Sequence, residues 1–181
     1  GVVEIAAGTL TSAAAGMTST GGTFSVSDGA LLRYTGGTNT IVNSTFNGAG
    51  LTEVSGGTLL VSGSTIGGNF RLSSGAIGGG GLFTVNSGGS FGWSGGALIG
   101  TGTLAVATSG SLQISGGDPK SFYRGDGNGS GGRIITNAGT TTWSGAGSLL
   151  GGDGAAFSNL AGGLFDAQSD ATFGHTGGGN G

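Results

Sequence analysis

Cysteine is absent from this 181-residue chain, and proline occurs once. Without cysteine the chain can form neither disulfides nor thiolate metal sites. One proline among 48 glycines excludes a collagen helix, which needs abundant proline and glycine at every third position. No apolar run approaches the roughly 20 residues that a membrane-spanning helix requires, so we expect no membrane insertion.

Charge is equally scarce, with five basic and eight acidic residues and a formal net charge of −3. A surface of this kind offers no basic track for the phosphates of a nucleic acid. It offers no polybasic patch for anionic lipid either. We therefore expect no nucleic-acid partner.

Groups that carry out catalysis are also few. His175 is the only histidine and lies in a glycine-rich stretch, which leaves a Ser-His-Asp arrangement or a histidine metal site without a good candidate. A glycosidase needs positioned carboxylates, and Asp166 and Asp170 lie close together only in an irregular segment. We predict that the chain is not an enzyme and needs no cofactor, and a polysaccharide-active enzyme is the least favoured alternative.

A repeated unit fills most of the chain. The stretch from Trp93 to Ile114 shows it best, as Trp-Ser-Gly-Gly, then Gly-Thr-Leu-x-Val, then Ser-Gly-Ser-Leu. Apolar residues alternate with small polar ones, which is the period of a β-strand. Glycine pairs stand between these segments, where a chain turns tightly. Variants of the unit restart at steps of 16 to 29 residues.

Such a period indicates a repeat architecture, because one coil cannot bury its own apolar face and stacked coils can. We predict an all-β fold, a parallel β-solenoid (β-helix) of roughly seven coils of irregular length, about 16–29 residues each. Residues 1–176 would form this single domain, and residues 177–181 a glycine-rich tail. The alternative is an antiparallel β-sandwich with the glycine pairs as hairpin turns.

Residues 118–133 interrupt the pattern as a predicted corner-loop insertion. They hold five of the charges, the only proline and the only lysine. Functional residues concentrate on loops that a rigid scaffold carries, although an exposed corner loop with solvated charges would look the same. The residues of the candidate binding loop are Asp118, Lys120, Phe122, Tyr123, Arg124 and Asp126.

The same insertion contains a candidate calcium site. Asp126, Asn128 and Ser130 place oxygen atoms at alternate positions, as the first half of an EF-hand loop does. The closing glutamate is missing, since Asn137 stands at its position, and no flanking helices are apparent. Calcium therefore remains a hypothesis, and we predict no other metal.

Three aromatic residues, Tyr34, Trp93 and Trp143, occupy equivalent positions of the repeat and would form one column. Facing inward the column would fill the core, and facing outward it would be a platform for sugar rings. Threonine-rich stretches such as Thr101 to Thr103 suggest the hypothesis of an ice-binding threonine array. We set this aside because the threonines do not recur at the same point of every repeat.

The tryptophan-serine-glycine starts at Trp93 and Trp143, with the segments that follow them, resemble the glycine/threonine-rich repeats of large bacterial surface proteins. These include autotransporter-associated strand repeats and filamentous adhesins, and the resemblance covers about Thr23 to Phe165. The insertion and the uneven repeat length depart from it. The resemblance implies a structural or adhesive β-solenoid module displayed outside a bacterial cell.

Partners would then be copies of the chain or flanking repeats, since open solenoid ends favour end-to-end assembly into a filament. The alternative function is a carbohydrate-binding module that contacts surface glycans through exposed aromatic residues.

Overall fold

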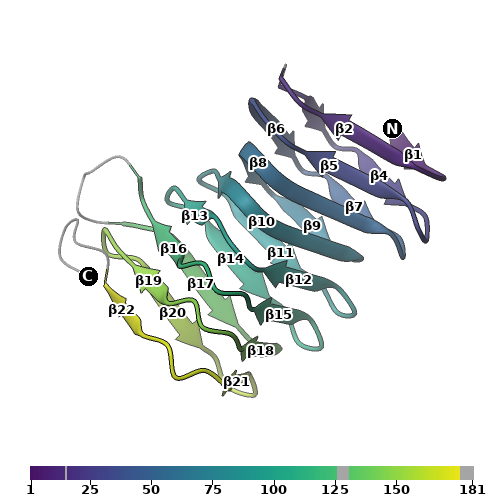
Figure 1. Ribbon diagram of the computed structural model, residues 1–181. Coiled ribbons are helices and arrows are strands. Elements are labelled where there is room, and N and C mark those ends of the chain that lie inside the picture. The colour runs from purple at the N-terminus through teal and green to yellow at the C-terminus, as the bar shows by residue number, and fades with distance from the viewer. Residues whose placement is uncertain (15, 126–130, 176–181) are drawn as a thin grey trace.

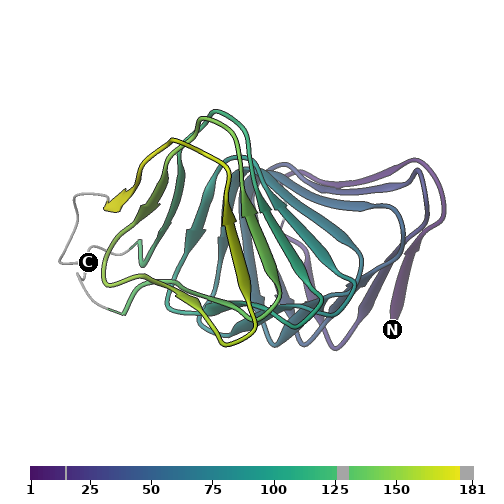
Figure 2. The same ribbon diagram turned by 90° about the horizontal axis from the view of Figure 1, so that it is seen from below.

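The computed structural model describes residues 1–14, 16–125 and 131–175. Within these residues the chain contains β-strands and no helix, and every strand pairing is parallel. Successive coils stack along one axis, with the first and last coils at opposite ends (Figures 1 and 2). The predicted parallel β-solenoid is confirmed, and the antiparallel sandwich is wrong.

Each coil contributes one strand to each of three faces. Face 1 is an eight-stranded sheet of β1 (Val2–Ile5), β4 (Thr23–Val26), β7 (Thr45–Asn47), β9 (Ser64–Ile66), β11 (Leu82–Val85), β14 (Thr103–Val106), β17 (Ile134–Asn137) and β20 (Ala156–Asn159). Faces 2 and 3 together form a 14-stranded sheet, because β8 (Leu51–Ser62) and β10 (Asn69–Gly78) run through the corner between them.

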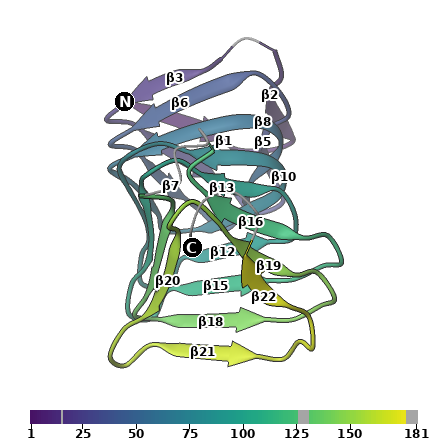
Figure 3. The same ribbon diagram turned by 90° about the vertical axis from the view of Figure 1, so that its left-hand side faces the viewer.

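Face 2 begins with β2 and ends with β21, and its strands run side by side in the same direction (Figure 3). It contains β2 (Thr9–Ser12), β5 (Leu31–Tyr34), the first halves of β8 and β10, β12 (Ser90–Trp93), β15 (Ser111–Ile114), β18 (Thr140–Trp143) and β21 (Leu164–Ala167). Face 3 contains β3 (Thr18–Thr20), β6 (Thr38–Val42), the second halves of β8 and β10, β13 (Ala97–Ile99), β16 (Lys120–Tyr123), β19 (Leu149–Gly151) and β22 (Phe173–His175).

The described residues form about eight coils where the sequence predicted roughly seven. Along face 2 one residue column holds Ser12, Tyr34, Val54, Leu72, Trp93, Ile114, Trp143 and Ala167, at steps of 18 to 29 residues. The sequence pattern also suggests repeat starts at Ile5, Val61 and Ile77, but Ile5 lies on face 1 and the other two lie on face 3. Strand period alone cannot tell one face from the next, because all three alternate in the same way.

Alternate side chains of each strand point inward and form one continuous core. Phe24 and Phe46 stack with ring centroids 5.2 Å apart, and Phe70, Phe83 and Phe91 continue the aromatic packing. All five rings are buried. A coil on its own would leave these side chains in water, so burial couples each coil to its neighbours.

The corner between faces 2 and 3 is built from glycine. Gly57 and Gly75 have φ values of +66° and +76° and lie on successive coils. A Cβ atom on Gly75 would come within 2.5 Å of the backbone oxygen of Gly57. Backbone therefore packs on backbone at this corner, which explains the glycine pairs of the repeat.

Candidate functional site

Part of the predicted insertion at residues 118–133 belongs to a coil. Lys120 to Tyr123 form β16, which pairs with β13 on one side and β19 on the other. The side chains of Lys120 and Phe122 point inward and are buried. These two residues therefore do not form an exposed binding loop, because alternation along β16 turns every second side chain into the core.

Lys120 carries its amine into that core. Its Nζ atom donates a hydrogen bond to the Gly116 carbonyl at 3.2 Å. Burial lowers the pKa of Lys120, and nearby Asp118 opposes this shift. The amine is closed off from solvent, so it acts as a structural group that ties β16 to the corner before it.

The remaining residues of the candidate loop lie near the surface. Asp118 is exposed, and Tyr123 and Arg124 are half-buried. Asp126, with Asn128 and Ser130 of the calcium hypothesis, lies outside the described residues. Of the six predicted loop residues, two are therefore buried, three lie at or near the surface, and Asp126 is outside the described residues.

Asp153 accepts hydrogen bonds from Gly125 and Gly132, which both follow β16 in the chain. Its Oδ2 atom accepts a hydrogen bond from the Gly125 amide at 3.3 Å, and its carbonyl accepts one from the Gly132 amide at 2.8 Å. Asp153 is buried and has a φ of +55°, an unusual backbone conformation for a residue other than glycine. The Gly-Gly-Asp-Gly stretch around it is thus a structural turn.

Arg133 is the least expected residue of the interior. Its side chain is fully buried, and its Nη1 atom donates to the carbonyls of Gly79 (3.3 Å) and Ile99 (3.4 Å) on preceding coils. Among the described residues, Nε and Nη2 have no hydrogen-bond partner. Burial lowers the pKa of Arg133 to about 10, so the guanidinium is still positive at neutral pH. In the sequence, Arg133 is one of the five charged residues of the predicted corner loop, whose charges would be solvated.

Tyr34, Trp93 and Trp143 share one register position on face 2, separated by aliphatic residues. All three side chains point inward and are buried. The indole nitrogens of Trp93 and Trp143 donate to the carbonyls of Gly96 and Gly147. The Tyr34 hydroxyl is buried and has no hydrogen-bond partner in the part of the chain that the structure describes, and burial raises its pKa. The column fills the core and gives sugars no platform.

A charged cluster lies on the outer surface of face 2. Glu53 accepts hydrogen bonds from Arg33 and Arg71, its register neighbours on the coils below and above, and from Ser73. The ion-pair distances are 2.9 Å to Arg33 and 2.7 Å to Arg71. The Glu53 side chain is only 4% exposed, whereas the arginines are 41% and 45% exposed. Desolvation acts to raise the pKa of Glu53, but Ser73 and the arginines outweigh it and lower the pKa.

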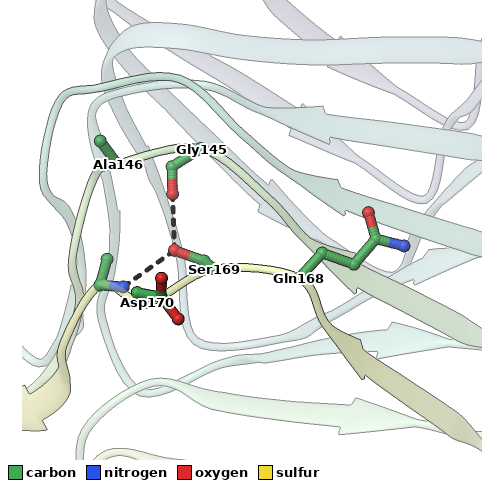
Figure 4. A pocket seen from close by; sticks show the side chains of 6 residues that line it. Gly145, Ala146, Gln168, Ser169 and Asp170 are labelled. Carbon is green, nitrogen blue, oxygen red and sulfur yellow. Dashed lines mark hydrogen bonds between the residues drawn. The ribbon is translucent and has the colours of Figure 1, made fainter.

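A shallow concavity lies at the last corner between faces 2 and 3 (Figure 4). Ser169 donates to the Gly145 carbonyl at 2.6 Å and accepts from the Ala171 amide at 3.0 Å. Its hydroxyl is therefore occupied by the turn, and no histidine is among the described residues that line the concavity. Asp170 is the only carboxylate among the lining residues, so the pair of carboxylates that a glycosidase needs is missing from it.

Sequence reasoning missed a threonine column. Thr23, Thr45, Thr65 and Thr84 follow one another in register on the outer surface of face 1. The column continues with Ala105, Thr136 and Ser158. Thr65 donates to Thr45 at 3.2 Å. From β4 to β20 the outward strand residues of this face carry no charge. Only the strand register shows the column, because the spacing between its members varies.

Within the described ranges no cluster of three or more His, Cys, Asp or Glu side chains could hold a metal. No helix in that part of the chain is long and apolar enough to cross a membrane. Comparisons with protein-family models, curated proteins and solved structures found no match to this chain.

Proposed function

We propose that this chain is a structural or adhesive β-solenoid module of an extracellular bacterial surface protein, which assembles end to end into a filament. One observation carries the proposal: a single core runs from the first coil to the last and leaves some inward residues of both terminal coils exposed. Val3 and Leu10 are 39% and 38% exposed at one end, and Phe173 is 48% exposed at the other. A rod of stacked coils spans a distance and transmits force along its axis.

The weakly charged surface supports the same role. Face 1 presents threonine, serine, alanine and a few exposed aliphatic residues, among them Leu82 and Ile134. Rods with such a face can pack closely side by side, because from β4 to β20 no outward charge of face 1 has to be desolvated. The extracellular bacterial location rests on the resemblance of the repeats alone.

Electron microscopy of the purified chain at several concentrations tests the proposal. We expect unbranched particles of constant width whose length grows with concentration. Isolated short rods at every concentration would instead favour a spacer whose ends are covered by flanking repeats. Compact particles without a long axis would contradict both forms of the proposal.

Carbohydrate binding remains the second candidate and now depends on Tyr123, which is half-buried at the end of β16. Titration of the chain with a panel of surface glycans tests it, with Tyr123→Ala as the loss-of-contact variant and Trp93→Ala as the matched core control. Binding that Tyr123→Ala abolishes would support this candidate. Absence of binding, or equal binding by the wild-type chain and Tyr123→Ala, would exclude a Tyr123 platform.

A further inference from the structure

The two ends of the solenoid expose different apolar surfaces. At the first coil, Val3 and Leu10 have the inward register positions that Phe24 and Leu32 occupy on the next coil. Phe24 and Leu32 are at most 1% exposed, whereas Val3 and Leu10 are 39% and 38% exposed. The first coil therefore ends in an aliphatic surface that nothing in the described structure covers.

The last coil ends in an aromatic surface. Phe157, Phe165 and Phe173 come from faces 1, 2 and 3, and their ring centroids lie 5.0 to 6.4 Å apart. Within the described residues, β20 and β21 pair only with β17 and β18, so their outer edges have no strand beside them. Unpaired edges of this kind accept a further strand.

We propose that a second copy of this chain binds here head to tail, with its β1 on β20 and its β2 on β21. The inference rests on the proposed function and adds the partner, the direction and the register. The strands of the second copy must run parallel to β20 and β21 to continue the ladder, which only head-to-tail contact allows. The contact joins two different surfaces at opposite ends of one stack, so it continues along the same axis and repeats into a filament.

Continuing the internal register fixes the pairs. Val3 of the second copy would lie on Asn159, and Leu10 on Phe165, so on face 2 an aliphatic side chain covers an aromatic ring. On the outer surface Val2 would lie beside Ser158, and Thr11 beside Asp166. No two like charges face each other along these two ladders, so the contact has no electrostatic penalty.

The absence of cysteine allows a direct test by disulfide cross-linking. Val2→Cys and Ser158→Cys are made in separate chains, mixed and mildly oxidised. Paired strands lie about 4.8 Å apart, within the Cα separation that a disulfide spans. Glu4→Cys with Ser158→Cys is the matched control, because a two-residue offset exceeds that separation. We expect about tenfold more cross-linked dimer from the in-register pair than from the control.

Each outcome has a separate meaning. Equal cross-linking in the control would overturn the register, and dimers formed by Val2→Cys chains alone would overturn the head-to-tail direction. No cross-linked product, together with a monomer in sedimentation velocity, would overturn the second copy as partner. In that last case, rods of constant width in electron microscopy would leave the spacer form of the proposed function intact. Val3→Lys in the Val2→Cys chain should abolish the product while the circular dichroism spectrum stays unchanged.

Discussion

At the scale of single residues, glycine is required where the backbones of successive coils touch. Gly75 and Gly88 both have positive φ values, of +76° and +77°. A Cβ on Gly75 would overlap Gly57, whereas one on Gly88 would meet nothing within 4 Å. The two positions therefore separate backbone strain from steric overlap.

Gly88→Ala should lower the free energy of unfolding by about 1–2 kcal/mol, the cost of a left-handed conformation. Gly75→Ala should cost about 3 kcal/mol or more, because the corner must also move apart. Urea denaturation of both variants measures the difference. Equal losses would show that the corner yields without cost.

Glu53 makes stability depend on pH. Since its folded-state pKa is lowered, its contribution is complete above the unfolded pKa of about 4.3 and is lost as pH falls through the folded value. Glu53→Gln should cost about 1–2 kcal/mol at pH 7, a modest figure because both arginines are nearly half exposed. Denaturation at pH 7 and pH 3 checks this, and the gap between variant and wild type should shrink in acid. A constant gap would assign the loss to packing.

At the scale of elements, the corner before β17 contains a buried charge without an ion-pair partner among the described residues. Arg133→Met should leave the free energy of unfolding within about 1 kcal/mol of the wild type, because replacing a buried charge by an apolar group is often neutral or stabilising. The Gly79 carbonyl would keep its hydrogen bond from the Gly102 amide.

Arg133→Lys is the informative comparison, because lysine keeps the positive charge on a shorter side chain. It should be less stable than Arg133→Met in the same thermal and urea denaturation experiments. A loss of about 3 kcal/mol or more in Arg133→Met would mean that a compensating group holds the guanidinium.

At the scale of the whole molecule, stability is a sum over coils and their contacts. Removing Ser55–Leu72 deletes one complete coil, since Val54 and Leu72 occupy the same register position. The shortened chain should fold with a β-rich circular dichroism spectrum and a lower melting temperature. Deleting Ser55–Val61 is the control, because a partial coil breaks the register and should abolish cooperative unfolding. Unfolding of the complete-coil deletion would contradict the repeat assignment.

The sequence by itself determined the class of fold. Alternating apolar residues, glycine pairs and restarts at steps of 16 to 29 residues are local features, and they predict strands and tight turns and favour stacked coils over a sandwich. Tryptophan and tyrosine at equivalent positions of the repeat also followed from local pattern, because equivalent positions share a register.

Only the tertiary structure decided which side chains point into the core and which point to solvent. Lys120 and Arg133 look like solvated charges in a loop, but β16 and the corner before β17 turn them inward. The threonine column was invisible because coil lengths vary, so residues that stack in space are unevenly spaced in the chain. Burial and register depend on contacts between coils, and neither is encoded in the spacing of one repeat.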